Sequence, residues 1–364
     1  MRLARTRYPL LGLVISASVA LSGTSALADT RYSPTDLGTL DGNASFALGL
    51  NERGEVAGTS RTTSAFRPQL AFRWRDGTMT NLGSLPGSTF SRAFEINARG
   101  TAVGEAFTPS PERSRAVLWE GGRIEDLGTL PGATGAVAND INARSQVAGT
   151  SGGRAFLWTR GAMRDLGSLS ENPAATSRGN ALNDRGQVVG TAQTDTLSPF
   201  GSRVSHAFLW ERGTMTDLGS PVPDRYSTAL AISRHGDVVG EANVATISGC
   251  CNDSYHAVLW SNGTIVDLHT WLPDGLATVR HSRATDVNSG GQVVGHVSGF
   301  FGFPTIDGRA VLWHDGHAHD LNDFLPPDSG WLLRSAEGIN ERGQIVGYGS
   351  FEGQTRAFLL TPGG

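Results

Sequence analysis

The stretch Asn183-Asp184-Arg185-Gly186-Gln187-Val188-Val189-Gly190, followed by His206-Ala207-Phe208-Leu209-Trp210 and Asp217-Leu218-Gly219, decides the fold. Its pieces are short, rich in β-branched and aromatic residues, and separated by turns that contain glycine, which is the pattern of β-strands. In the link from Asn183 to Gly186, the asparagine closes a turn and the glycine takes a positive φ, as in a hairpin. With the apolar segment that ends at Asn183, the stretch predicts a unit of four strands.

This unit is repeated along the chain, and some copies are degenerate. The quartet that ends in tryptophan recurs at Ala71–Trp74, Ala116–Trp119, Ala155–Trp158, Ala257–Trp260 and Ala310–Trp313, and a last copy without tryptophan stands at Ala357–Leu360. The asparagine element starts again at Asn51, Asn97, Asn142, Ser233, Asn288 and Asn340. The sequence therefore contains seven copies of one four-strand unit.

The apolar pattern of the copies favours a β-propeller over a sandwich. The second and third strands are apolar almost throughout, so both faces of each small sheet must be buried. Blades stacked around an axis bury both faces, whereas a sandwich leaves one face of each sheet in water. Trp119 and Trp158 are 39 positions apart and Trp260 and Trp313 are 53 apart, a variation that propeller loops tolerate. The sequence predicts an all-β fold, a seven-bladed β-propeller of four-stranded blades.

The two ends of the repeat array predict how the propeller closes. A lone fourth strand, Tyr32 to Leu37, precedes the first complete copy, and the last copy stops after its third strand at Leu360. We expect the N-terminal strand to complete the last blade. This closure leaves no open sheet edge, which would otherwise pair with other chains.

The N-terminus has the features of a secretory signal peptide. Three arginines in the first seven residues precede the apolar run Leu10–Leu21 and the tripeptide Ala26-Leu27-Ala28. This order predicts a signal peptide at residues 1–28 and a mature propeller at residues 29–364. We expect an exported protein, periplasmic or extracellular. No later apolar stretch is long enough to cross a bilayer, so we expect no membrane insertion.

Composition narrows the partners and cofactors. The chain has no lysine and a formal net charge of -4, which gives no reason to expect a nucleic-acid partner. The only cysteines, Cys250 and Cys251, are adjacent. In an oxidising compartment they form a vicinal disulfide or pair with another chain, and the alternative is two unpaired loop thiols. Two sulfurs do not make a zinc site. We expect a monomer without cofactor or metal.

The repeat resembles the HAF repeat family, often described as extracellular repeat proteins. The residues that carry the resemblance are His206-Ala207-Phe208, the following Leu209-Trp210, and Asp217-Leu218-Gly219. The resemblance extends over almost all of residues 29–364 and implies secretion and repetition, but no catalytic residues. Other copies depart from the tripeptide because arginine stands where His206 does, at Arg115, Arg154, Arg309 and Arg356.

Candidate binding residues lie in the variable loops. In a propeller, the second-to-third and fourth-to-first loops share one face, and here these loops vary in length while the others are short and uniform. Because function favours variable loops on a rigid scaffold, we expect the functional face at this end. Phe300, Phe301 and Phe303 either contact a ligand there or fold onto their neighbours. Trp271 and Trp331 either stack on a sugar ring or pack between blades.

Three carboxyl groups form a less symmetric set. Glu95, Asp140 and Asp286 stand on innermost strands, two places before the turn asparagine, where other copies have glycine or alanine. If they face the channel, clustering raises a pKa or holds a cation, and paired carboxylates are also what glycoside cleavage requires. The alternative is that each pairs with an arginine of the neighbouring blade. His317 and His319 lie on one side of a strand, either near a metal or on a solvated hairpin.

These observations favour a secreted, non-enzymatic binding propeller that recognises a glycan, peptide or surface partner through its variable-loop face. The first alternative is an extracellular carbohydrate hydrolase or lyase that uses Glu95, Asp140 and Asp286. The second alternative is a structural component of a surface or matrix. A propeller fold does not choose among them, because one fold hosts many functions.

Overall fold

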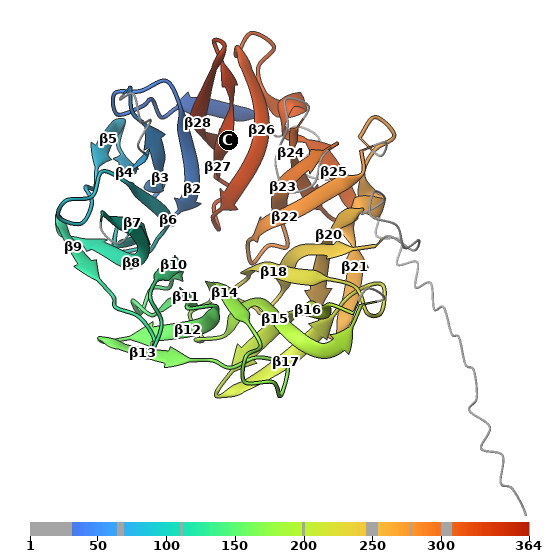
Figure 1. Ribbon diagram of the computed structural model, residues 1–364. Coiled ribbons are helices and arrows are strands. Elements are labelled where there is room, and N and C mark those ends of the chain that lie inside the picture. The colour runs from blue at the N-terminus through green and yellow to red at the C-terminus, as the bar shows by residue number, and fades with distance from the viewer. Residues whose placement is uncertain are drawn as a thin grey trace, which may run out of the picture.

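Most strands pair with the strands that precede and follow them along the chain. The computed structural model describes residues 31–63, 69–109, 112–198, 201–244, 254–276, 279–299 and 308–363. These residues form strands and two short 3₁₀ helices, η1 (Leu268–Trp271) and η2 (Leu321–Phe324). The sheets are arranged around a common centre (Figure 1). The predicted signal peptide, Cys250, Cys251, Phe300, Phe301 and Phe303 lie outside the described residues.

The first four sheets each hold four consecutive antiparallel strands. The first consists of β2 (Ser45–Leu50), β3 (Val56–Arg61), β4 (Gln69–Arg75) and β5 (Thr78–Asn81). The second consists of β6 (Ser91–Ile96), β7 (Ala102–Pro109), β8 (Glu112–Glu120) and β9 (Arg123–Asp126). The third consists of β10 (Ala136–Ile141), β11 (Val147–Ser151), β12 (Arg154–Thr159) and β13 (Ala162–Asp165). The fourth consists of β14 (Ser177–Leu182), β15 (Val188–Leu197), β16 (Arg203–Glu211) and β17 (Thr214–Gly219).

An eight-stranded sheet follows. Its first half holds β18 (Ser227–Ile232), β19 (Val238–Asn243), β20 (Tyr255–Ser261) and β21 (Thr264–Asp267). Its second half holds β22 (His281–Val287), β23 (Val293–Ser298), β24 (Arg309–His314) and β25 (His317–Asp320). Each half is antiparallel, and the halves are joined by one parallel pair, Tyr255 with His281. The sheet is therefore mixed at a single residue pair.

The last sheet combines the two ends of the described chain. It holds β26 (Trp331–Ile339), β27 (Ile345–Phe351), β28 (Gln354–Pro362) and β1 (Tyr32–Asp36). β1 pairs antiparallel with β28 from Tyr32 opposite Pro362 to Asp36 opposite Phe358. This pairing supplies the fourth strand that the last copy lacks in sequence. No helix in the described part of the chain is long and apolar enough to span a membrane.

The core consists of apolar clusters between neighbouring sheets. One cluster joins Val103 and Ala116 of the second sheet to Ala138, Phe156 and Trp158 of the third. The phenylalanine in the second position of the quartet is completely buried in four copies, at Phe72, Phe156, Phe208 and Phe358. Apolar second and third strands therefore bury both faces, because each sheet packs between two others.

Polar side chains fix one sheet to the next. The Oγ of Ser227 donates to the carbonyl of Gly219 over 2.7 Å and accepts from the amide of Ala207 over 2.9 Å. Ser45, Ser91 and Ser177 make the same pair of bonds in their copies. Because Ser227 lies in the sheet after Gly219 and Ala207, each such serine joins two sheets.

The repeated acidic position of the D-L-G element is a turn residue. Asp217 Oδ1 accepts from the amide of Gly219 over 2.7 Å, and the equivalent residue of every other copy accepts from the amide two positions on. Asp217 also pairs with His206 over 2.9 Å, as Asp165 pairs with Arg154 over 3.2 Å. The histidine of the H-A-F tripeptide therefore does the structural work that arginine does in other copies.

Candidate ligand-binding site

A β-bulge in each innermost strand shapes the centre of the molecule. The strands nearest the centre are β2, β6, β10, β14, β18, β22 and β26 (Figure 1). In each of them the pairing with the next strand skips one residue, three places before the turn residue. A bulge re-aims the skipped side chain. β26 also skips Arg334, nearer its start. The residues skipped three places before the turn residue are Leu48, Phe94, Asn139, Asn180, Leu230, Thr285 and Glu337.

All of these skipped residues line one open pocket of about 700 Å³. Every innermost strand contributes to it, so the pocket lies at the centre of the ring. The volume falls within the range of about 300–1,000 Å³ that small-ligand sites occupy. The side chains at the bulged positions differ among copies and include apolar, amide, hydroxyl and carboxyl groups. The strands that carry them repeat from copy to copy. The result is an asymmetric pocket in a repetitive frame.

The pocket opens at the end of the molecule that carries the long loops. Its lining includes Phe46, Arg92 and Arg283, which lie near the starts of the innermost strands, away from the turn asparagines. Arg61 and Gln69, at the end of β3 and the start of β4, also line it. These positions border the second-to-third loops, which the sequence predicted to share the functional face.

Two of the three lining arginines have buried carboxylate partners. Arg92 Nε donates to Glu105 Oε1 over 2.7 Å, and Ser114 Oγ donates to Glu105 Oε2 over 2.5 Å. Arg283 donates to Glu241 Oε1 over 3.0 Å. Burial raises the pKa of Glu241, and the charge of Arg283 opposes that rise. These arginines therefore have much of their charge offset by the protein.

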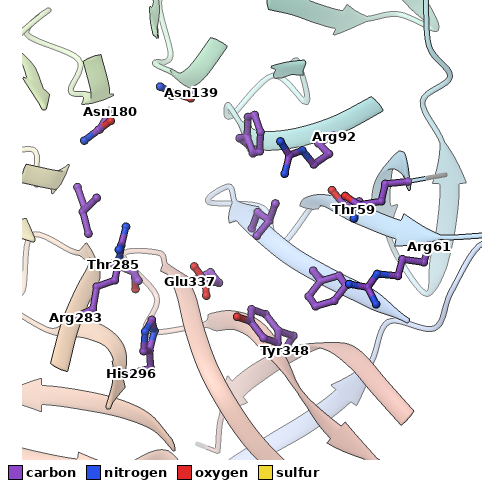
Figure 2. A pocket seen from close by; sticks show the side chains of 15 residues that line it. Thr59, Arg61, Arg92, Asn139, Asn180, Arg283, Thr285, His296, Glu337 and Tyr348 are labelled. Atoms are coloured by element: carbon purple, nitrogen blue, oxygen red, sulfur yellow. The ribbon is translucent and has the colours of Figure 1, made fainter. Parts of the chain in front are cut away.

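Arg61 is different. Its guanidinium lies over the ring of Phe46, 5.3 Å from the ring centre, and that ring meets Tyr348 edge-on at 5.0 Å. Within the described residues its side chain has no ion pair and no hydrogen-bond acceptor. Stacking on an aromatic face leaves the N–H edge of a guanidinium open. Figure 2 shows Arg61 on one side of the pocket and the amides of Asn139 and Asn180 on the opposite side.

Glu337 belongs to a small buried network. Ser335 Oγ donates to Glu337 Oε1 over 2.5 Å and lies 2.9 Å from His296 Nδ1. When Glu337 is ionised, the hydroxyl proton of Ser335 goes to it, and the proton between Ser335 and His296 is then on Nδ1. Burial lowers the pKa of His296 to about 3, so its ring is neutral. Burial raises the pKa of Glu337, although Ser335 and Arg283 oppose the rise. Ser335 is completely buried and is not placed as a nucleophile.

The amides opposite Arg61 are held by the next sheet. Asn139 Nδ2 donates to the carbonyl of Gly179 over 2.7 Å, and Asn180 Nδ2 donates to the carbonyl of Ala229 over 2.7 Å. The nitrogen of each amide is thus fixed toward the protein. The two Oδ1 atoms remain as hydrogen-bond acceptors at the pocket.

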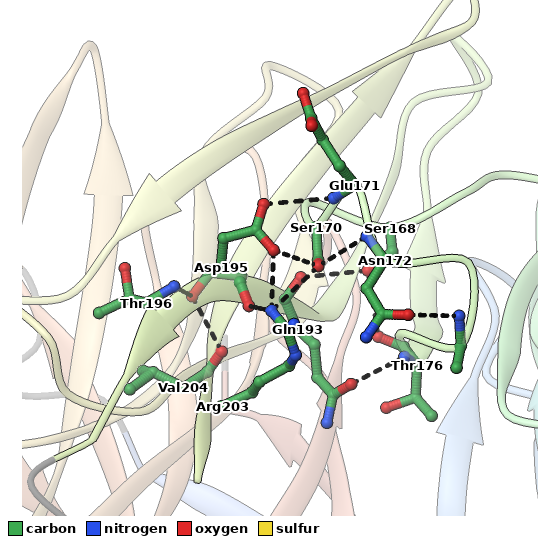
Figure 3. A network of polar contacts seen from close by, with 12 residues as sticks. Ser168, Ser170, Glu171, Asn172, Thr176, Gln193, Asp195, Thr196, Arg203 and Val204 are labelled. Carbon is green, nitrogen blue, oxygen red and sulfur yellow. Dashed lines mark hydrogen bonds and ion pairs between the residues drawn. The ribbon is translucent and has the colours of Figure 1, made fainter. Parts of the chain in front are cut away.

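The variable loop between the second and third strands of the fourth sheet extends the β15–β16 hairpin, of which residues 199 and 200 are not described. Arg203 pairs with Asp195 over 2.8 Å, and Ser170 of the preceding loop donates to Asp195 over 2.6 Å (Figure 3). The hairpin is therefore fixed to its neighbour. The base of this hairpin lines a second pocket of about 580 Å³, which shares Asn180, Leu230 and Arg283 with the first.

Glu95, Asp140 and Asp286 each stand one position after the bulge of their strand, on the side of the turn residue. Their partners are backbone amides rather than arginines. Asp140 accepts from Ile141 over 2.6 Å and from Leu182 over 2.7 Å. Asp286 accepts in the same way from the amide after it and from Ile339 of the next sheet, each over 2.8 Å. Each carboxylate thus joins two innermost strands.

Glu95 follows the same pattern toward the preceding sheet, through the amides of Ile96 and Leu50. Burial raises the pKa of Asp140 to about 6 and of Asp286 to about 7. Burial and the facing Asp140 raise the pKa of Glu95 well above its ordinary value. None of the three is among the described residues that line the pocket. Among the described residues, no three His, Cys, Asp or Glu side chains are grouped to hold a metal ion.

The two predicted tryptophans pack against core clusters. Trp331 stacks on Phe351 with 4.7 Å between ring centres and meets Phe358 edge-on. Trp271 ends η1 and packs against the cluster that contains Leu268 and Leu272. Neither is among the described residues of the pocket.

Comparison with known proteins supports the fold. No family model matches the chain. No curated protein matches it either. Among solved structures, the chain is similar to the β-propeller domain of the Trilobed protease from Pyrococcus furiosus, with 10% identity and a TM-score of 0.53, over 87% of this chain and 94% of that one. It also matches the acylaminoacyl peptidase from Pyrococcus horikoshii, with 10% identity and a TM-score of 0.48, over 86% of this chain and 52% of that one.

The chain thus spans about half the length of the peptidase and nearly all of the propeller domain. At this level of identity, the similarity shows the fold alone. The expected all-β propeller of four-stranded antiparallel sheets is confirmed at the level of fold.

Proposed function

We propose that the protein is an exported, non-enzymatic recognition propeller of the HAF repeat type, which binds a glycan in the central pocket. We count each half of the eight-stranded sheet as a blade, because one residue pair alone joins the halves, and this count gives seven blades. The observation that carries the proposal is the bulged ring. The scaffold repeats, yet the side chains that the bulges turn into the pocket differ from copy to copy.

The chemistry of the lining favours a glycan. Sugar rings present hydroxyl groups that donate and accept, together with apolar faces that pack on rings. The pocket offers the Oδ1 acceptors of Asn139 and Asn180, the N–H donors of Arg61, and the rings of Phe46 and Tyr348. A mixture of a few polar groups among apolar ones is typical of small-ligand sites.

The hydrolase alternative has weaker support. Glycoside cleavage needs two carboxyl groups that flank the bond, about 5 to 10 Å apart in a pocket. Glu337 is the one carboxyl side chain among the described residues that line the pocket. The oxygens of Asp140 and Asp286 are occupied by backbone amides.

A glycan-array screen of the propeller from Asp29 onward tests the proposal. The matched variants are Leu230→Trp, which fills the pocket, and Arg144→Ala, an exposed change near a turn asparagine on the opposite face. We expect specific glycan binding by the wild type that Leu230→Trp abolishes and Arg144→Ala retains, with melting temperatures that show both variants folded. Absence of binding to any glycan, or binding that Leu230→Trp leaves intact, would overturn it.

A further inference from the structure

The polar groups that line the pocket indicate the charge of its ligand. Resting on the proposed function, we infer that the ligand is an acidic saccharide, whose carboxylate is bound by Arg61 and whose hydroxyl groups donate to Asn139 and Asn180. The argument depends on which polar groups of the pocket already have partners in the protein and which do not.

The cationic groups differ in this respect. Arg92 and Arg283 each hold a glutamate that is at most 5% exposed, so their charge is directed into the protein. Arg61 is half-buried in the same pocket, and within the described residues no carboxylate forms an ion pair with it. A cation withdrawn from water gains by meeting an anion. The planar fork of a guanidinium matches the two oxygens of a carboxylate, which makes a carboxylate a fitting partner.

The neutral groups opposite Arg61 call for donors. Asn139 and Asn180 each use an N–H on a backbone carbonyl of the next sheet, over 2.7 Å, and among the described residues neither Oδ1 has a donor, so these oxygens are left for donors of a ligand. Carboxylates cannot satisfy these oxygens, whereas hydroxyl groups can. A ligand that joins a carboxylate to several hydroxyl groups within one ring satisfies both sides of the pocket. Uronic acids and sialic acids have this chemistry.

Glu337 lines the same pocket, and its negative charge would repel the carboxylate of an acidic ligand. Its Oε1 is occupied by Ser335, and the nearby charge of Arg283 offsets its negative charge. Burial raises the pKa of Glu337, which favours its neutral form. The pocket therefore does not place a full, uncompensated negative charge against the carboxylate of a ligand.

The experiment compares each acid with its own uncharged form. The probes are glucuronate, galacturonate and sialic-acid oligosaccharides, each beside its methyl ester, and a glutamate-rich peptide. The proteins are the wild type, Arg61→Gln, Arg61→Lys, Leu230→Trp and Arg144→Gln. Isothermal titration measures affinity, and thermal unfolding checks that each variant is folded.

We expect the wild type to bind at least one acid more tightly than its ester by about 10- to 100-fold, the range for hydrogen bonds to a charged group. Arg61→Gln should bring the acid to the affinity of the ester and leave the ester unchanged. Arg61→Lys should restore part of the preference, and Arg144→Gln should keep all of it.

The inference is overturned if acid and ester bind equally, if Arg61→Gln keeps the preference, or if the peptide binds in place of the saccharides. Equal binding of acid and ester that Leu230→Trp abolishes leaves the proposed function standing and removes this inference alone. If none of these saccharides binds, the inference is overturned, and if no glycan of the array binds either, the proposed function fails with it.

Discussion

The Nδ2 atom of Asn340 donates a hydrogen bond to the backbone oxygen of Asn51 over 3.2 Å, and the two residues are 289 positions apart in the chain. The bond joins the last copy of the repeat to the first. Equivalent bonds run from Asn51 to Asn97, from Asn97 to Asn142, from Asn142 to Asn183, from Asn183 to Ser233, and from Asn288 to Asn340. The turn residues thus form a nearly continuous belt around the face opposite the pocket.

The belt is interrupted at Ser233, whose shorter side chain donates to Asp237 instead. Ser233→Asn should supply the missing bond to the carbonyl of Asn288 and stabilise the protein by about 0.5–1.5 kcal/mol. Asn340→Ala should destabilise it by about 1–3 kcal/mol, since buried backbone groups lose their partner. Urea unfolding monitored by tryptophan fluorescence measures both. Destabilisation by Ser233→Asn would show that the belt does not extend to this copy.

The histidine of the H-A-F tripeptide is expected to be structural. His206→Arg should change the free energy of unfolding by less than about 0.5 kcal/mol, because arginine pairs with the same aspartate in other copies. His206→Ala should cost about 1 kcal/mol through the lost bond to Asp217. Both variants should bind ligand as the wild type does. Loss of binding in His206→Arg would assign this histidine a direct role.

Stability should fall as pH rises from 6.5 to 8. Burial raises the pKa of Asp286 from 3.8 to about 7, so the folded protein holds a proton that the unfolded chain has released. This stabilisation is complete below pH 3.8 and is lost as pH rises through 7. Below pH 6.5 the buried His269 and His296 act in the opposite direction, because burial lowers their pKa values to about 4 and about 3.

Urea unfolding at pH 6.5 and at pH 8 measures this effect, with Asp286→Asn as the comparison. The variant should be less stable overall, because an amide cannot accept from both backbone N–H groups, but its stability should change less between the two pH values. An equal change in wild type and variant would show that Asp286 is ionised throughout this range.

Glu337 should control the pH dependence of ligand binding. As pH rises and Glu337 ionises, its charge should oppose an acidic ligand, so the affinity of the wild type for an acidic saccharide should fall. Glu337→Gln should remove this decline and bind the acid about 3- to 10-fold more tightly at pH 8, as expected for one partly screened charge. Titration calorimetry across pH measures it, with the methyl ester as the uncharged control. A decline that persists in Glu337→Gln would assign the titration to another group.

The strands and turns were predictable from the sequence because each copy repeats the same short signals. The hydrogen bonds between turn asparagines, and those that Ser227 and its equivalents make, join neighbouring sheets. The sequence of one copy does not show which residues of the next sheet are their partners. Glu95, Asp140 and Asp286 were correctly placed on innermost strands, but their backbone partners leave no mark in the sequence. Among the described residues, none of the three has the arginine partner that was the expected alternative.

The pocket itself was missed for a specific reason. Alternation along a strand assigns each residue to one face, and a bulge breaks this alternation at Leu48, Asn139, Glu337 and their equivalents. A signal was nonetheless present. The position three places before the turn residue varies in character among copies, whereas the position before it is alanine or glycine in every copy.

The central claim is that ligand binds in the bulge-lined pocket. Methyl NMR of leucine-labelled protein tests it most directly, because Leu48 and Leu230 line the pocket, whereas Leu127 is buried between sheets away from it. On titration with the acidic saccharides and their esters, we predict shifts of the Leu48 and Leu230 methyl signals, with Leu127 unchanged. A saccharide that binds without moving the signals of Leu48 and Leu230 would contradict the account.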